Sequence, residues 1–119
     1  KGKDIVNSFH LIKKKRGKFV ITVTNYQTPI NHSLKINKKG TVIMRYPKKF
    51  LKRTQDLENN YHDAGHIYWA TIKDLLKYKN TTNKALGYFL DNMRVQDIND
   101  HVDWKLAEMK FKLLRKKQK

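Results

Sequence analysis

The sequence of 119 residues contains no cysteine, which excludes disulfide bonds, a thiol nucleophile and any cysteine-ligated zinc or iron–sulfur site. It has no apolar run near the roughly 18–20 residues of a membrane span and no signal-peptide region at its start. Glycine-rich dinucleotide motifs, Walker phosphate loops and Gly-x-Ser-x-Gly nucleophile elbows are also missing. We therefore expect a cytoplasmic protein that does not bind membranes and does not hold a complete nucleotide site by itself.

Acidic residues are scarce, and the 10 Asp+Glu against 27 Lys+Arg leave a net charge of +17. The excess lies in residues 1–53, with 15 basic and 1 acidic side chain, and in residues 109–119, with 6 basic and none acidic. Residues 54–108 hold 6 basic and 9 acidic side chains. Lysine supplies 22 of the positive charges, whereas base reading favours arginine. The pattern favours a solvated lysine surface without a specific nucleic-acid partner; a lysine-rich nucleic-acid-binding module on residues 1–53 and the tail is the alternative.

Hydrophobic residues make up 39% of the chain, and their spacing predicts alternating helices and strands. Helices are expected over Asp4–Lys15, from a Thr71 cap with Asp74 three residues on, and from an Asp100 cap with an apolar stripe of Val102, Leu106, Met109 and Leu113. Strands are expected over Phe19–Tyr26, Gly65–Ala70 and Leu86–Leu90, and Arg94–Ile98 is expected to continue the last of them. A hairpin is expected to join Leu34–Ile36 to Thr41–Tyr46 through a turn that ends at Gly40.

This alternation indicates an α/β fold. The first helix has no preceding strand from which to return, so the chain looks like the later part of a larger α/β domain. We expect residues 1–119 to form a single partial domain, with 115–119 as a frayed basic tail. A partial domain leaves apolar surface uncovered, and we therefore expect a homo-oligomer.

Two segments combine side chains that could bind a ligand. The first carries Arg53 and Gln55 and continues through Tyr61 to Tyr68, which suits an anionic, hydroxyl-rich ligand. The alternative, which residue types alone favour, is an Arg–Asp pair that pins a loop while the aromatic rings fill a core. His62 and His66 have the four-residue spacing of a helical metal site, but the surrounding sequence predicts a loop entering a strand.

The second segment carries Asp97 and Asn99 on either side of Ile98. In an extended chain both oxygen-bearing side chains point the same way, and Ile98 is then expected to face the core. Two hard oxygen ligands at the end of a strand predict a Mg²⁺ site, because Mg²⁺ is usually held by one or two carboxylates together with substrate phosphates. The alternative is that Asp97 and Asp100 serve only as turn and N-cap residues.

At this level of detail the sequence resembles the acylneuraminate cytidylyltransferases, and most of all the pseudaminic acid branch. The resemblance is carried by Arg53–Leu57 (Arg-Thr-Gln-Asp-Leu), by Tyr61–Trp69 (Tyr-His-Asp-Ala-Gly-His-Ile-Tyr-Trp) and by Val95–Glu108, with Asp97, Ile98, Asp103, Trp104, Leu106, Ala107 and Glu108 in the family's order. Val23-Thr24 ahead of Pro29-Ile30 and the hairpin agree with it. It covers nearly the whole chain but only the carboxyl-terminal half of the family's domain.

The resemblance implies a nucleotide-diphospho-sugar-transferase-like, Rossmann-like three-layer domain with a mixed sheet and a hairpin. It also implies transfer of CMP from CTP to the anomeric hydroxyl of a nine-carbon sugar acid, with Mg²⁺ as cofactor. By position the substrate-binding residues are Asn31, Arg53, Gln55, Tyr61 and Tyr68, and the metal ligands are Asp97 and Asn99. No catalytic residue is assigned.

Two departures from the family pattern bear on function. Asn99 stands where a second metal-binding aspartate is usual, which predicts weaker Mg²⁺ binding and leaves a non-catalytic paralogue as an alternative. Thr54 stands where many sialic-acid enzymes have a second arginine, which argues against N-acetylneuraminate as the sugar. Because the half of the family's domain that binds CTP has no counterpart in this sequence, we expect the chain to be inactive by itself.

Overall fold

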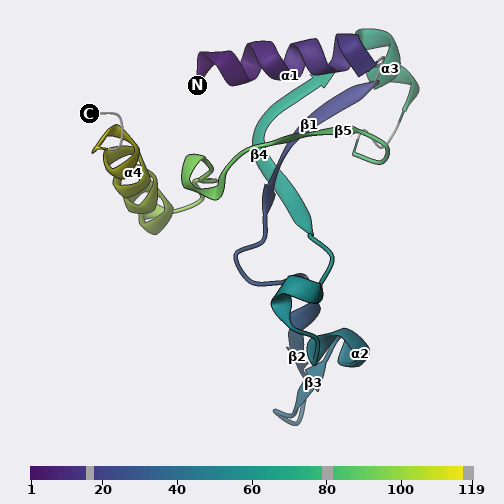
Figure 1. Ribbon diagram of the computed structural model, residues 1–119, viewed down its shortest axis with the longest axis vertical. Coiled ribbons are helices and arrows are strands. Elements are labelled where there is room, and N and C mark those ends of the chain that lie inside the picture. The colour runs from purple at the N-terminus through teal and green to yellow at the C-terminus, as the bar shows by residue number, and fades with distance from the viewer. Residues whose placement is uncertain (16–17, 79–81, 117–119) are drawn as a thin grey trace. The chain divides into compact units, whose positions relative to one another are not determined.

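The computed structural model describes residues 1–15, 18–78 and 82–116 and divides the chain into two compact units. Unit 1 is formed by Lys1–Thr24 and Asp63–Lys119, and unit 2 is formed by Asn25–His62. The sequence alone had predicted a single partial domain. Each unit is described by itself below, and Figure 1 shows the order of their elements.

Unit 1 is an α/β unit built on a mixed three-stranded sheet. The strand order is β4-β1-β5, and β1 runs parallel to β5 with Val20 opposite Leu86 and Val23 opposite Phe89 (Figure 1). Its elements are α1 (Gly2–Lys15), β1 (Phe19–Asn25), β4 (Tyr61–Ala70), α3 (Ile72–Lys77), β5 (Leu86–Phe89), the 3₁₀ helix η3 (Asn92–Arg94) and α4 (His101–Lys116). The expected α/β class is confirmed at this level.

The core of unit 1 centres on β1, the middle strand. Phe19, Val20 and Ile21 are buried in succession, as expected for a β-branched and aromatic segment covered on both faces. Ile12 adds a buried apolar side chain from α1. A second cluster joins Ala64, Leu90 and Val95, with Tyr88 packed against it.

A buried carboxylate fastens α1 to the segment after β5. Asp4 is 4% exposed, pairs with the guanidinium of Arg94, and accepts a hydrogen bond from the Tyr88 hydroxyl at 3.2 Å. Burial raises the pKa of Asp4, but hydrogen bonds from Arg94 and the terminal ammonium group outweigh it and lower that pKa to about 2. Asp4 is therefore ionised in the folded protein at neutral pH.

Unit 2 consists of a hairpin and short helical turns. Strands β2 (Leu34–Ile36) and β3 (Val42–Met44) pair antiparallel, and Gly40 (φ +79°) ends the turn between them, as expected. The other elements are the 3₁₀ helices η1 (Ile30–His32) and η2 (Thr54–Asp56) and the short helix α2 (Pro47–Phe50). Asn37 closes the hairpin turn, because its Oδ1 accepts from the backbone N–H groups of Lys39 and Thr41 at 2.9 and 3.0 Å.

Helix caps are confirmed where the sequence placed them, and some boundaries differ. Thr71 Oγ1 accepts from Asp74 N–H at 3.1 Å, and Asp100 Oδ1 accepts from the N–H groups of Val102 and Asp103 at 2.8 and 2.9 Å. Strand β4 begins at Tyr61, earlier than the predicted Gly65.

Two predictions about the carboxyl-terminal third are wrong. Arg94–Ile98 does not continue β5, because the chain turns through η3 instead. Ile98 does not face the core, since it is 49% exposed. Helix α4 includes Arg115 and Lys116 of the predicted tail, and residues 117–119 lie outside the described residues.

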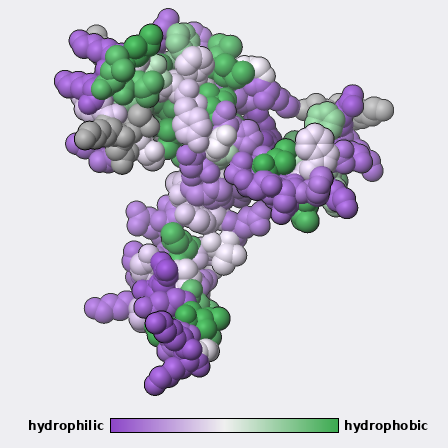
Figure 2. Space-filling model, turned by 180° about the vertical axis from the view of Figure 1, so that it is seen from behind, coloured by the Kyte–Doolittle hydropathy of each residue, from purple (hydrophilic) through white to green (hydrophobic). Residues whose placement is uncertain are grey.

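Apolar side chains lie on the surface of both units (Figure 2). The predicted stripe on α4 is exposed, from 42% at Leu106 to 64% at Val102. Ile72, Leu75 and Leu76 on α3 and Leu34, Ile36 and Val42 on the hairpin are exposed as well. Within the described part of the chain, no helix combines the length and apolar character needed to cross a membrane.

Candidate functional site

Strand β4 places an aspartate and a tyrosine side by side on its exposed face. The Tyr68 hydroxyl donates to Asp63 Oδ2 at 2.8 Å, and Asp63 Oδ1 accepts from the backbone N–H of Gly65 at 2.9 Å. Tyr68 is 56% exposed. Asp63 thus fixes the position of a phenol that stays open to a ligand.

Asp97 lies near enough to this pair to act on it electrostatically. The hydrogen bond to Asp63 raises the pKa of Tyr68, and partial burial and the charges of Asp63 and Asp97 raise it further. Tyr68 is therefore a neutral phenol at physiological pH. We call Asp63, Tyr68, Asp97 and Asn99 the Tyr68 cluster.

Asp97 and Asn99, the predicted metal ligands, are in contact. Asn99 Nδ2 donates to Asp97 Oδ2 at 3.2 Å, so both side chains lie on one side of the chain as predicted. Asp103 Oδ2 fixes this segment by accepting from the backbone N–H of Asn99 at 3.0 Å. Both side chains are exposed, and their carboxylate and amide oxygens are ligands that Mg²⁺ accepts.

The predicted metal site has few candidate ligands. Among residues 1–15, 18–78 and 82–116 no three His, Asp or Glu side chains gather as they would around a metal ion. Two oxygen ligands fit an ion that takes its remaining ligands from water and substrate phosphates, as Mg²⁺ commonly does. His62 and His66 lie on β4 and not on a helix, as the sequence indicated.

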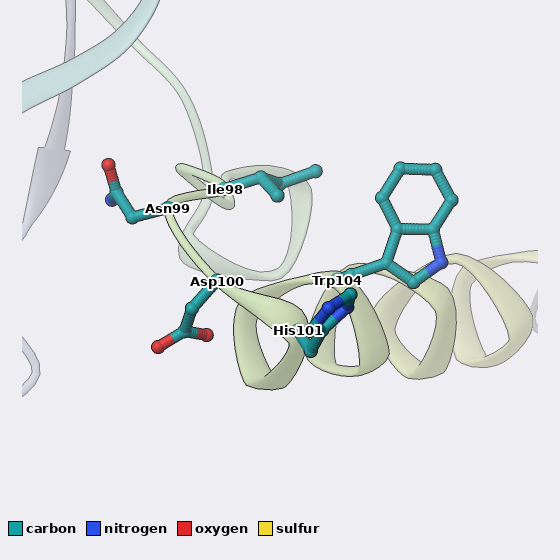
Figure 3. A pocket seen from close by; sticks show the side chains of 5 residues that line it. All are labelled: Ile98, Asn99, Asp100, His101 and Trp104. Atoms are coloured by element: carbon teal, nitrogen blue, oxygen red, sulfur yellow. The ribbon is translucent and has the colours of Figure 1, made fainter.

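An open hollow adjoins the Tyr68 cluster at the start of α4 (Figure 3). Asn99 contributes to its lining, and the other lining residues are Ile98, Asp100, His101 and Trp104. In Figure 3 the side chains of Ile98 and Trp104 extend to the same side, whereas Asn99 and Asp100 point elsewhere. Residues of both kinds line the hollow, and Ile98 and Trp104 form its apolar side. The sequence did not predict His101 or Trp104 as site residues, although both were expected in the first turn of the last helix, directly after Asn99 and Asp100.

Unit 2 carries the other predicted substrate-binding residues. Arg53 and Gln55 are exposed on either side of Thr54, at the start of η2, and Tyr61 is 50% exposed. Asn31 differs from them because it is buried, at 4% exposure. The alternative of an Arg–Asp ion pair that holds this loop is not observed in the part of the chain that the structure describes. The two ion pairs found among the described residues both involve Asp4.

Thr54 lines a polar hollow within unit 2. The hollow has a volume of about 220 Å³, and its lining also includes Tyr26, Glu58 and Asn60. Arg53 and Gln55 flank Thr54 in sequence but do not line the hollow themselves. The sequence analysis missed Tyr26, which ends the predicted first strand and whose ring lies 5.0 Å from that of His62.

Comparison with known proteins identifies two similar bacterial enzymes. The pseudaminic acid cytidylyltransferase of Campylobacter jejuni subsp. jejuni serotype O:2 is 29% identical over 113 residues, which cover 93% of this chain and 49% of the relative. The enzyme of the same name from serotype O:23/36 is 30% identical over 99 residues, which cover 82% of this chain and 43% of the relative. No family model matches the chain.

The chain thus spans about half the length of the curated relatives it matches. The similarity extends over most of the described residues of both units. The resemblance to the acylneuraminate cytidylyltransferases, and to pseudaminic acid cytidylyltransferases among them, is therefore confirmed.

Proposed function

We propose that the chain is the sugar-acid-binding, carboxyl-terminal half of a CMP-nonulosonate synthetase. In this reaction the anomeric hydroxyl of a nine-carbon sugar acid attacks the α-phosphate of CTP, a new P–O bond forms, and pyrophosphate leaves. The observation that supports it most is the similarity to a pseudaminic acid cytidylyltransferase over 93% of the chain. The expected fold is the three-layer, nucleotide-diphospho-sugar-transferase-like domain, to which the mixed sheet of unit 1 would belong.

Exposed polar side chains of each unit, considered separately, could contact a sugar acid. In unit 2 the exposed guanidinium of Arg53 can pair with a carboxylate, and the Gln55 amide and Tyr61 hydroxyl can bond hydroxyl groups. In unit 1 the exposed Tyr68 hydroxyl, fixed by Asp63, offers a further polar contact. Asn31 is buried, so its role would be to support unit 2 rather than to contact the ligand.

Asp97 and Asn99 would hold a Mg²⁺ ion, and the pair fits as a two-ligand set. When bound, the ion would neutralise charge on the phosphates of CTP. The Asn99 amide at present donates to Asp97, so its oxygen would have to turn toward the ion. A neutral amide in place of a carboxylate predicts weak binding, and Asn99→Asp is expected to raise Mg²⁺ affinity.

The test has two parts. Pyrophosphate release is measured with CTP, Mg²⁺ and a panel of nine-carbon sugar acids on the full-length polypeptide that contains this chain, and pseudaminic acid is expected to be turned over. The 119-residue chain is expected to bind the sugar acid, seen as shifts of amide NMR signals in β4, but to release no pyrophosphate. Absence of release with every sugar acid on the full-length polypeptide would overturn the assignment.

A non-catalytic paralogue is distinguished in the same assay. Asn99→Asp should increase the rate at limiting Mg²⁺, because a second carboxylate adds a charge to the ligand set. Asp100→Asn is the control, since Asp100 caps α4 and takes no part in the predicted metal site. An equal response of both variants to Mg²⁺ would show that position 99 is not a ligand.

A further inference from the structure

Asp63 and Tyr68 are hydrogen-bonded although they are five residues apart on one strand. In a regular strand successive side chains alternate between faces, so residues five apart point to opposite sides. The Tyr68 hydroxyl nevertheless lies 2.8 Å from Asp63 Oδ2. The alternation of β4 must therefore change phase between these two positions.

The change of phase occurs at Gly65. Ala64 is 2% exposed, and Ile67 and Trp69 are partly buried, whereas His66 and Tyr68 are exposed. Gly65 itself has φ +68°, a left-handed conformation that glycine adopts without strain. One extra residue at a left-handed glycine is the pattern of a β-bulge, and it brings Asp63 and Tyr68 to the same face.

Side chains on both strands satisfy the backbone of this bulge. Thr22, fully buried on β1, accepts from the N–H groups of Ile67 and His66 at 3.0 and 3.3 Å. Asp63 Oδ1 accepts from the N–H of Gly65. The backbone N–H groups of the bulge therefore have hydrogen-bond acceptors, which removes the free-energy cost of leaving them unpaired.

The hydrogen bond between Asp63 and Tyr68 has only one possible direction. An ionised carboxylate can only accept, so the phenolic O–H must donate to it. The Tyr68 oxygen then has a lone pair left to accept a hydrogen bond from outside. A ligand group that meets Tyr68 must consequently be a donor, such as a hydroxyl or an amide N–H.

We propose that Asp63, held by the Gly65 bulge, is a positioning residue that fixes the Tyr68 hydroxyl as an acceptor for a hydroxyl or amide N–H of the sugar acid. This inference rests on the proposed function and specifies what one part of the site recognises. Because the Tyr68 hydroxyl already donates to Asp63, it has no proton to offer a carboxylate, so the carboxylate of the ligand does not bind at Tyr68.

The first test separates binding of the sugar acid from binding of CTP, in the full-length polypeptide. In Asp63→Asn the side-chain oxygen can still accept from Gly65, but the amide NH₂ can donate to Tyr68 and reverse its hydrogen bond. The KM for the sugar acid should rise about tenfold, while the KM for CTP and kcat stay unchanged. Tyr68→Phe should have a similar effect, and the double variant should be no worse than Tyr68→Phe alone.

Glu108→Gln is the matched control. It removes the same charge from an exposed position on α4 and should leave both KM values unchanged. A uniform fall in activity of Asp63→Asn for both substrates, or an unchanged KM for the sugar acid, would overturn the positioning role. Failure of the wild-type protein to turn over any sugar acid would instead overturn the proposed function.

The second test needs no activity. With tyrosine labelled by ¹³C at Cζ, Tyr68→Phe identifies the Tyr68 signal in the 119-residue chain. Asp63→Asn should move that signal, because the phenol loses a charged acceptor, and should leave the signals of Tyr26 and Tyr46 in place. Circular dichroism checks that both variants are folded. A Tyr68 signal that does not move would overturn the inference whatever the kinetics show.

Discussion

The two units of the chain differ in what holds them together. All buried apolar side chains of the described residues lie in unit 1: Ile12, Phe19, Val20, Ile21, Ala64, Leu90 and Val95. Unit 2, which the structure describes in full, buries only the polar Asn31. Unit 1 is therefore stabilised by a core, whereas unit 2 depends on turns, ring contacts and local hydrogen bonds.

This difference matters for how a ligand would be recognised. In unit 1 the Tyr68 cluster is fixed by a strand, a bulge and hydrogen bonds to neighbouring side chains. In unit 2 Arg53 and Gln55 lie at a short 3₁₀ turn with little packed around them. A two-stranded hairpin with exposed faces is marginally stable alone. Unit 1 thus holds Tyr68 in a fixed position, whereas few contacts hold Arg53 and Gln55 in unit 2.

The largest expected effect comes from the buried charge of unit 1. Arg94→Met leaves the Asp4 carboxylate buried without its main partner and should lower the free energy of unfolding by about 3–5 kcal/mol. Arg45→Met is the control in unit 2, where the side chain is exposed, and should change it by less than about 0.5 kcal/mol. Urea unfolding followed by circular dichroism measures both, and equal losses would contradict the contrast between the units.

An isoleucine in each unit provides the next comparison. Ile21 is 9% exposed in β1, and Ile36 is 71% exposed in β2. Ile21→Ala should cost about 2–4 kcal/mol through lost burial and the cavity that remains, while Ile36→Ala should cost less than about 0.5 kcal/mol. The same urea titrations apply. A large loss for Ile36→Ala would show that the hairpin is covered in solution, as it would be in the expected homo-oligomer.

Acid should act on unit 1 through Asp4. Its pKa is about 2 in the folded protein, below the ordinary value of 3.8. The folded state therefore holds its proton less strongly, and the resulting stabilisation is present above about pH 4 and is lost as the pH falls toward 2. Thermal unfolding between pH 5 and 2 should show a fall in Tm that is smaller in Asp4→Asn. An equal fall in both proteins would assign the acid sensitivity to other groups.

Local signals in the sequence predicted most of these elements. The apolar spacing over Asp4–Lys15 predicted α1. Thr71 and Asp100 predicted the helix caps, and the turn ending at Gly40 predicted the hairpin. The motif around Gln55 and Tyr68 carried the resemblance that the relatives confirm. Side-chain types and their spacing within a few residues were sufficient to predict these elements and this resemblance.

What could not be predicted depends on contacts between distant residues. The strand expected over Arg94–Ile98 is absent, because the chain turns through η3 at this point. The Arg94 guanidinium pairs with Asp4, 90 positions earlier. The bond between Asp63 and Tyr68 requires the bulge at Gly65, and a period-two pattern places the two on opposite faces. No local pattern reports that Thr22 accepts from the backbone after that bulge.

The smallest expected effects test whether the two units unfold together. Asp100 in unit 1 and Asn37 in unit 2 have the same hydrogen-bonding role. The Oδ1 atom of each accepts from two backbone N–H groups within four residues, at 2.8–3.0 Å. Asp100→Ala should lower the stability of unit 1 by about 1 kcal/mol, as loss of a helix cap does. Asn37→Ala should lower stability by about the same amount, but this loss should be confined to the hairpin of β2 and β3.

Amide hydrogen exchange distinguishes these outcomes residue by residue. Asp100→Ala should speed exchange throughout β1 and β5 by about fivefold, because the core of unit 1 opens as one cooperative structure. Asn37→Ala should speed exchange in β2 and β3 alone. If Asn37→Ala also speeds exchange in β1, the hairpin contributes to the stability of the core, and the sparse burial of unit 2 does not then mean that it opens independently.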